Sequence, residues 1–126
     1  MDDRAFLEAF ERCQLAEFHH RDHVRAAWLY LSESPPLVAL ERFTASLKRF
    51  AAAQGKPGLY HETITWAYLF LIRERMRDGE TWDGFAERNP DLMQWKPSVL
   101  DRYYRAGTLA SPRARETFVL PDSSLS

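Results

Sequence analysis

The 126-residue sequence lacks the features of secreted and membrane proteins. It contains one cysteine, Cys13, so no disulfide can form within the chain. Its longest apolar run, residues 67–72, is far shorter than the roughly 20 residues of a membrane-spanning helix. No basic segment precedes an apolar run near the start, so we expect no signal peptide. These absences together predict a cytoplasmic protein.

The sequence also lacks an excess of charge of either sign. Lysine and arginine number 17, aspartate and glutamate number 18, and the formal net charge is -1. A protein that binds nucleic acid or an anionic membrane usually carries a clear basic excess. We therefore expect neither nucleic acid nor membrane as the main partner.

Signals for β-strands are nearly absent as well, whereas helical periodicity is common. Short alternating runs and Asn-Gly or Asp-Gly hairpin turns do not occur between apolar segments. The chain is 45% hydrophobic and 13% aromatic, which is sufficient for a packed core. We predict an all-α fold in which residues 1–121 form a single-domain helical bundle and residues 122–126 form a frayed tail.

Four longer helices are expected, followed by shorter C-terminal helices. Phe6, Phe10 and Cys13 share one face of the first helix, and the second covers residues 20–32. Two prolines start the third helix, which should stop near residue 55. The fourth, residues 60–77, has no polar face in its middle, so we expect it at the centre of the bundle. Shorter helices are predicted after four capping residues: Thr81, Asn89, Ser98 and Ser111.

Two histidine-containing stretches are the main functional signal. Three of the four histidines lie in FHHRDHV, residues 18–24, and the fourth opens YHETITW. Short connections favour antiparallel neighbours, so the second and fourth helices should run in one direction with their N-termini together. His19 should face solvent, since it lies off the apolar face. We therefore expect one shared pocket, lined by His20, His23, His61 and Glu62.

Such a pocket allows a metal site or a metal-free site. His20, His23 and His61 could hold zinc or iron, with Glu62 as a further ligand or general base. Without a metal, a histidine oriented by Glu62 could act on a small polar ligand, and the protein could be a small enzyme. Position 65 is threonine, so the HExxH pattern of zinc proteases is absent. A third alternative is that the histidines are structural or simply solvated.

A different class of function is an interaction module without chemistry, such as a helical adaptor or a homodimer. Exposed aromatic residues near Trp82, Phe85 and Trp95 would then form the contact surface. Replacement of a histidine should leave the binding of such an adaptor intact.

The sequence also resembles a family of small uncharacterised bacterial proteins. The similar stretches are FHHRDHVRAAWLYL, GLYHETITWAYLFLI, NPDLMQWKPSVLDRYY and SPRARETFVLPD, within residues 15–122. The resemblance implies a single-domain bacterial protein of the cytoplasm. It implies no activity, cofactor or catalytic residue.

Overall fold

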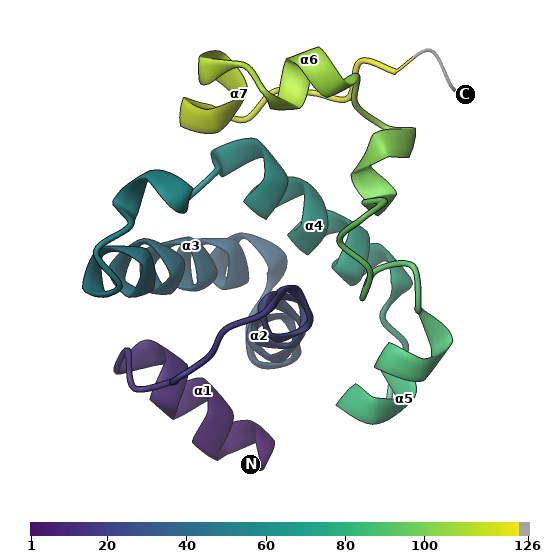
Figure 1. Ribbon diagram of the computed structural model, residues 1–126. Helices are drawn as coiled ribbons and strands as arrows, with labels where there is room; N and C mark the ends of the chain where they lie inside the picture. Colours follow the sequence, from purple (N-terminus) through teal and green to yellow (C-terminus); the bar gives the residue numbers. More distant parts are fainter. Residues whose placement is uncertain (124–126) are drawn as a thin grey trace.

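The computed structural model describes residues 1–123 and shows an all-α domain, which confirms the predicted fold class (Figure 1). The described residues contain no β-strand. The α-helices are α1 (Asp3–Glu11), α2 (His20–Glu33), α3 (Pro36–Ala53), α4 (Glu62–Arg75), α5 (Trp82–Arg88), α6 (Ala106–Leu109) and α7 (Pro112–Glu116). Two 3₁₀ helices, η1 (Pro57–Leu59) and η2 (Val99–Arg102), lie between them. Within the described range, no helix has the length and apolar character needed to cross a membrane.

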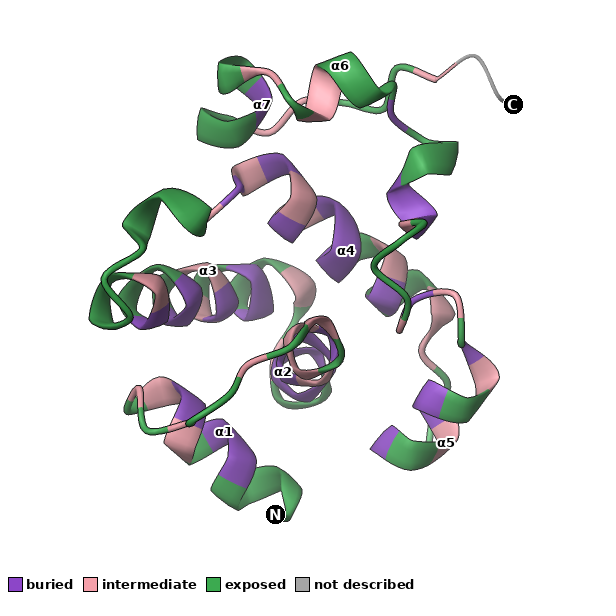
Figure 2. Ribbon diagram, viewed as in Figure 1, coloured by how far each residue is buried: buried purple, intermediate pink, exposed green. Residues whose placement is uncertain are grey.

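Helices α2 and α4 both lie at the centre of the domain. Helix α4 contacts α2, α3, α7 and η2, and α2 contacts α1, α3, α4 and α5 (Figure 1). Seven residues of α2 are buried. Buried residues of α1, α3 and α4 surround it in Figure 2. On α4, Phe70 is 38% exposed. The apolar outer side of α4 packs instead against the C-terminal segment, where the Trp66 and Phe118 rings stack 5.1 Å apart.

Helix α2 crosses α3 and α4 steeply, so the predicted antiparallel packing of α2 against α3 is wrong, whereas α3 and α4 run in roughly opposite directions, as predicted (Figure 1). Figure 1 shows α2 end-on, whereas α3 and α4 run across the view. Between α2 and α3, Ser34 and Pro35 are both extended, with ψ angles of 153° and 158°. Two extended residues turn the chain through a corner and do not reverse it. A short connection therefore makes two helices neighbours, but it does not determine their relative direction.

Helix α1 ends earlier than its apolar pattern predicts. Cys13 has a φ of 58°, in the left-handed region, so it lies beyond the helix. Its side chain is half-buried against the core. The core is further organised by Tyr30, whose hydroxyl donates a hydrogen bond to Glu11 and forms another with Ser46, both at 2.9 Å. These bonds connect α2 to α1 and α3.

The C-terminal third differs most from the prediction. Residues 90–93 form a turn instead of a helix, and α6 was not predicted. The segment after α7 returns over α4, where the Thr63 hydroxyl donates to the Thr117 carbonyl at 2.8 Å. Asp122, expected in a frayed tail, accepts a hydrogen bond from the backbone N–H of Arg105 at 3.0 Å and a second from the Thr108 hydroxyl. The remainder of the expected tail, residues 124–126, lies outside the described residues.

Candidate ligand-binding site

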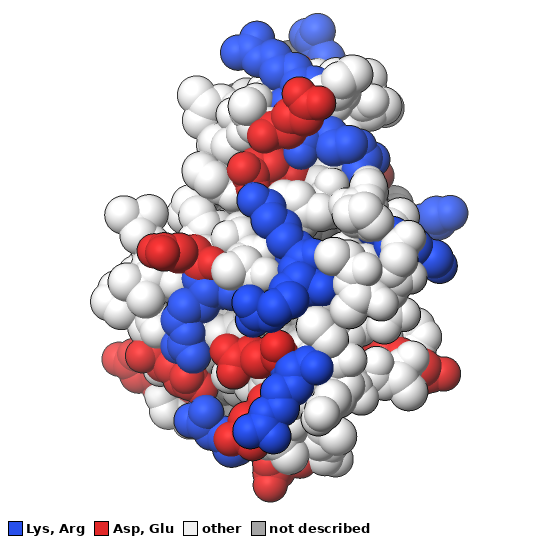
Figure 3. Space-filling model, turned by 90° about the vertical axis from the view of Figure 1, so that its left-hand side faces the viewer, with Lys and Arg blue, Asp and Glu red and all other residues white. Residues whose placement is uncertain are grey.

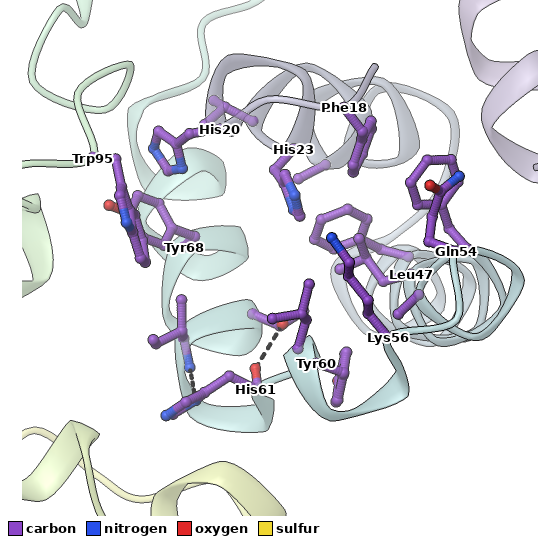
Figure 4. A pocket seen from close by; sticks show the side chains of 18 of the residues that line it. Phe18, His20, His23, Leu47, Gln54, Lys56, Tyr60, His61, Tyr68 and Trp95 are labelled. Carbon is purple, nitrogen blue, oxygen red and sulfur yellow. Dashed lines mark hydrogen bonds between the residues drawn. The ribbon is translucent and has the colours of Figure 1, made fainter. Parts of the chain in front are cut away.

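A cavity of about 550 Å³ lies where the start of α2, the end of α3 and the start of α4 meet. The loop that carries Trp95 closes one side, and the linker between α3 and α4 closes another (Figure 4). Most of the wall is aliphatic or aromatic, and this part includes Phe18, Val24, Phe43, Leu47, Phe50, Ile64, Ile72 and Trp95. His20, His23 and His61 also line it. The structure therefore brings all three predicted histidines to one cavity.

His20, in the first turn of α2, is held by the loop above it. Its Nε2 donates a hydrogen bond to the Leu92 carbonyl at 2.8 Å. Its ring centre lies 4.9 Å from that of Tyr68 and 5.2 Å from that of Trp95. Burial lowers the pKa of His20, and the hydrogen bond to Leu92 offsets part of this effect. The ring is therefore neutral near pH 7, with its proton on Nε2.

Both ring nitrogens of His61 are used by the fold. As the N-cap of α4, His61 accepts a hydrogen bond at Nδ1 from the backbone N–H of Ile64 at 3.1 Å. Its Nε2 donates to the Leu109 carbonyl of α6 at 2.7 Å. Burial is the main cause that lowers its pKa. His61 thus caps α4 and connects it to α6, and its ring points away from the middle of the cavity (Figure 4).

His23 differs from the other two histidines because its ring has no hydrogen-bond partner among residues 1–123. It lies one turn after His20, and its ring points into the cavity beside Phe18 (Figure 4). The two ring centres are 4.3 Å apart. Burial, with a smaller contribution from His20, lowers the pKa of His23 to about 4. A neutral imidazole therefore presents one donor and one acceptor nitrogen to the cavity.

Glu62 does not line the cavity, although the sequence predicts that it shares a pocket with the histidines. Its carboxylate accepts a hydrogen bond from the Tyr60 hydroxyl at 2.5 Å and another from Trp66 Nε1 at 3.1 Å. Burial and the contact with Glu62 raise the pKa of the Tyr60 hydroxyl above its ordinary value. Glu62 therefore orients Tyr60 of the wall and Trp66 outside it, and its carboxylate is not bonded to any of the three histidine rings among the described residues.

The chain matches no protein-family model, and no curated protein or solved structure is significantly similar to it. The functional assignment therefore depends on the geometry of the cavity. The resemblance to a bacterial family stays a prediction from the sequence.

A metal site gains no support from the side-chain positions. Within residues 1–123, no group of three or more histidine, cysteine, aspartate or glutamate side chains could hold a metal ion. The hydrogen bonds of His61 occupy both nitrogens that could coordinate one. Zinc or iron bound by His20, His23 and His61 therefore stays a prediction from the sequence.

The alternative contact surface is contradicted at two of its three aromatic residues. Trp82 and Phe85 are only 6% and 0% exposed. Both pack against Trp28 of α2, with ring centres 6.0 and 6.2 Å away. Helix α5 places both residues against α2. The sequence of α5, only seven residues long, did not indicate that they would be buried. Trp95, the third, is 45% exposed at the edge of the cavity.

Several cavity residues have no signal in the sequence. Lys56 belongs to the linker between α3 and α4, and its side chain extends over the cavity towards His23 (Figure 4). Arg115 of α7 also lines the cavity and donates hydrogen bonds to the carbonyls of Gly58 and Tyr60, at 2.7 and 3.2 Å. Lysine and arginine side chains gather across the middle of the face that Figure 3 shows. Only the tertiary fold brings α7 to the linker.

Proposed function

We propose that the protein binds a small molecule in this cavity. The molecule is apolar over most of its surface and carries one polar group that hydrogen-bonds the His23 imidazole. A volume of about 550 Å³ is within the range of roughly 300–1,000 Å³ typical of small-molecule sites. A mostly apolar wall with a few polar groups is also typical of such sites. This proposal corresponds to the metal-free histidine pocket predicted from the sequence, with His23 as its central residue.

The unpartnered ring of His23 is the observation that carries this proposal. His23 is half-buried, and its ring nitrogens bond to no residue in the described part of the chain, so they are free to bond to a molecule in the cavity. His20 and His61, which lie in the same wall, both have partners. A ligand group opposite His23 would supply the missing hydrogen bond.

The lining favours binding over catalysis. Among residues 1–123, it contains no serine, cysteine, aspartate or glutamate that could pair with His23 as a nucleophile or orienting group. The single threonine of the lining, Thr65, donates its hydroxyl to the His61 carbonyl at 2.7 Å. We also propose the cytoplasm as the compartment, because the lone thiol of Cys13 is half-buried and unpaired.

A fragment screen observed by NMR tests the proposal. The His23 ring Cε1–Hε1 signal is followed while a few hundred small polar and apolar fragments are added. We expect a subset to shift this signal saturably. Ala51→Trp, which places an indole in the cavity wall, should weaken these fragments about tenfold or more. Ala45→Trp is the matched control, since Ala45 is exposed on the same helix and does not line the cavity.

Two results would contradict the proposal. In one, no fragment shifts the His23 signal saturably at its solubility limit. In the other, the fragments that do so bind equally well to the Ala51→Trp and Ala45→Trp variants, which would place them elsewhere on the protein.

A further inference from the structure

The charged side chains in the cavity wall are all positive. Lys56 and Arg115 line the cavity, and no aspartate or glutamate does. The Lys56 ammonium group has neither an ion pair nor a hydrogen bond among the described residues. Arg115 is bonded to backbone carbonyls only. The ammonium group of Lys48 adds a further positive charge at this wall, 5.0 Å from the ring centre of Tyr60.

This excess of positive charge is local, since the whole chain has a formal net charge of -1. Glu62 accepts hydrogen bonds from Tyr60 and Trp66 at one oxygen and lies outside the lining. Lys56 and Arg115 are exposed at the edge of the cavity, where their positive charges attract an anion. The wall therefore favours a negatively charged ligand.

Aromatic rings form two separate parts of the wall. On one side, the ring of His20 contacts those of Tyr68 and Trp95, whose own centres are 6.4 Å apart. On the other side, Phe18 lies 4.9 Å from Phe50 and next to His23. Figure 4 shows these two groups on opposite sides of the view, with Lys56 reaching between them. Such surfaces suit a flat ring, because aromatic rings stack or meet edge to face.

We propose that the ligand is a small aromatic carboxylate, with its ring between these aromatic walls and its carboxylate between Lys56 and the His23 N–H. This inference rests on the proposed function and specifies the class of molecule that the cavity takes. Two donors would then face the carboxylate, a lysine ammonium group and a neutral imidazole N–H. Neither group bonds to a protein partner among the described residues, so both are available to the carboxylate.

Four probes of nearly equal size test the inference. They are 2-naphthoate, its neutral amide, 2-naphthylmethylamine and the saturated analogue decahydronaphthalene-2-carboxylate. Their dissociation constants are measured by calorimetry at pH 7.5, and the His23 NMR signal reports whether each one enters the cavity. We expect 2-naphthoate to bind about tenfold more tightly than its amide, the amine to bind most weakly, and the saturated acid to bind more weakly than 2-naphthoate.

Lys56→Gln should remove most of the preference for the carboxylate and leave the affinity for the amide unchanged. Lys96→Gln is the matched control, because Lys96 is exposed and lies outside this cavity. It should retain the full preference.

The outcomes separate this inference from the proposed function. If 2-naphthoate, its amide and the amine bind with equal affinity, and Ala51→Trp abolishes all three, the cavity binds small molecules but does not prefer an anion. This result would refute the inference and support the proposed function. A preference for the carboxylate that persists in Lys56→Gln would refute the role of Lys56. Equal affinity for the saturated acid would refute the aromatic part. If no probe shifts the His23 signal, both this inference and the proposed function are refuted for ligands of this size.

Discussion

Protonation of His23 should destabilise the folded protein in mild acid. In the folded chain the pKa of His23 is about 4, because its ring is buried, whereas its ordinary value is 6.5. Between these pH values the unfolded chain binds a proton that the folded chain does not, so stability falls as the pH falls. The destabilisation is absent above pH 6.5 and complete below pH 4. The pKa values of His20 and His61 are also lowered by burial, so both act in the same direction.

The magnitude follows from the two pKa values of His23. At about 1.4 kcal/mol per pH unit, the difference between 6.5 and about 4 corresponds to about 3 kcal/mol in total. Most of this loss is expected at pH 4.5, where the unfolded state is protonated and the folded state is only partly protonated. A typical domain is stable by about 5–15 kcal/mol, so the loss is large enough to measure.

Urea unfolding followed by circular dichroism measures this loss for the wild type and for His23→Asn at pH 7.5 and 4.5. Aspartate and glutamate also titrate in this range, but they contribute equally to both proteins and cancel in the difference. The variant should gain about 2–3 kcal/mol relative to the wild type as the pH falls. His19→Asn is the control, since the His19 side chain is 71% exposed. A constant difference between wild type and His23→Asn, or the same gain for His19→Asn, would refute the assignment of a buried neutral His23.

Two further substitutions test how the domain is held together. Thr63→Val removes the hydroxyl that donates to Thr117 and accepts from the Val119 N–H, so it should cost about 2 kcal/mol. It should also make the segment after α7 a faster target for limited proteolysis; unchanged cleavage would contradict this attachment. Tyr30→Phe removes the hydroxyl that connects α1, α2 and α3, and should cost about 1 kcal/mol in urea unfolding. A variant as stable as the wild type would show that these bonds contribute nothing.

Helix starts were predicted well where the capping group is close in sequence. The side chains of Thr81 and Ser111 accept hydrogen bonds from backbone N–H groups three residues later, at 3.1 and 3.2 Å. Helix α2 begins at His20, as predicted, and ends one residue later than predicted. These boundaries depend on local hydrogen bonds and on the spacing of apolar residues, and both can be read from a single sequence.

Boundaries that depend on distant contacts were not predictable in this way. Asn89 and Pro90 resemble a helix start, but the Asp91 carboxylate pairs with Arg75 of α4 at 2.7 Å. The Asn89 side chain is buried and donates to the Phe85 carbonyl at 2.9 Å instead of capping a new helix. Asp122 is likewise ordered by Arg105, which lies 17 residues earlier. In each case a tertiary partner determines the local conformation.

The sequence predicted that the three histidines lie near one another, and the structure places all three along one cavity, although the predicted direction of α2 relative to α3 and α4 was wrong. The starts of α2 and α4 meet at the cavity because each helix is one short connection away from α3. The roles of the histidines could not be predicted in the same way. The carbonyls that accept from His20 and His61 belong to Leu92 and Leu109, at separations of 72 and 48 residues. The third histidine, His23, has no such acceptor.

The absence of an acceptor for His23 says more about function than the clustering of histidines does. His61 contributes to stability through two hydrogen bonds, and His20 contributes through one, so the fold alone accounts for both. His23 lies on the same helix one turn later, half-buried, and its ring nitrogens have no partner within residues 1–123. Leucine or phenylalanine would fill this part of the wall equally well, so the fold alone does not account for a histidine there. A molecule in the cavity that bonds to the His23 ring would supply the partner that the protein does not.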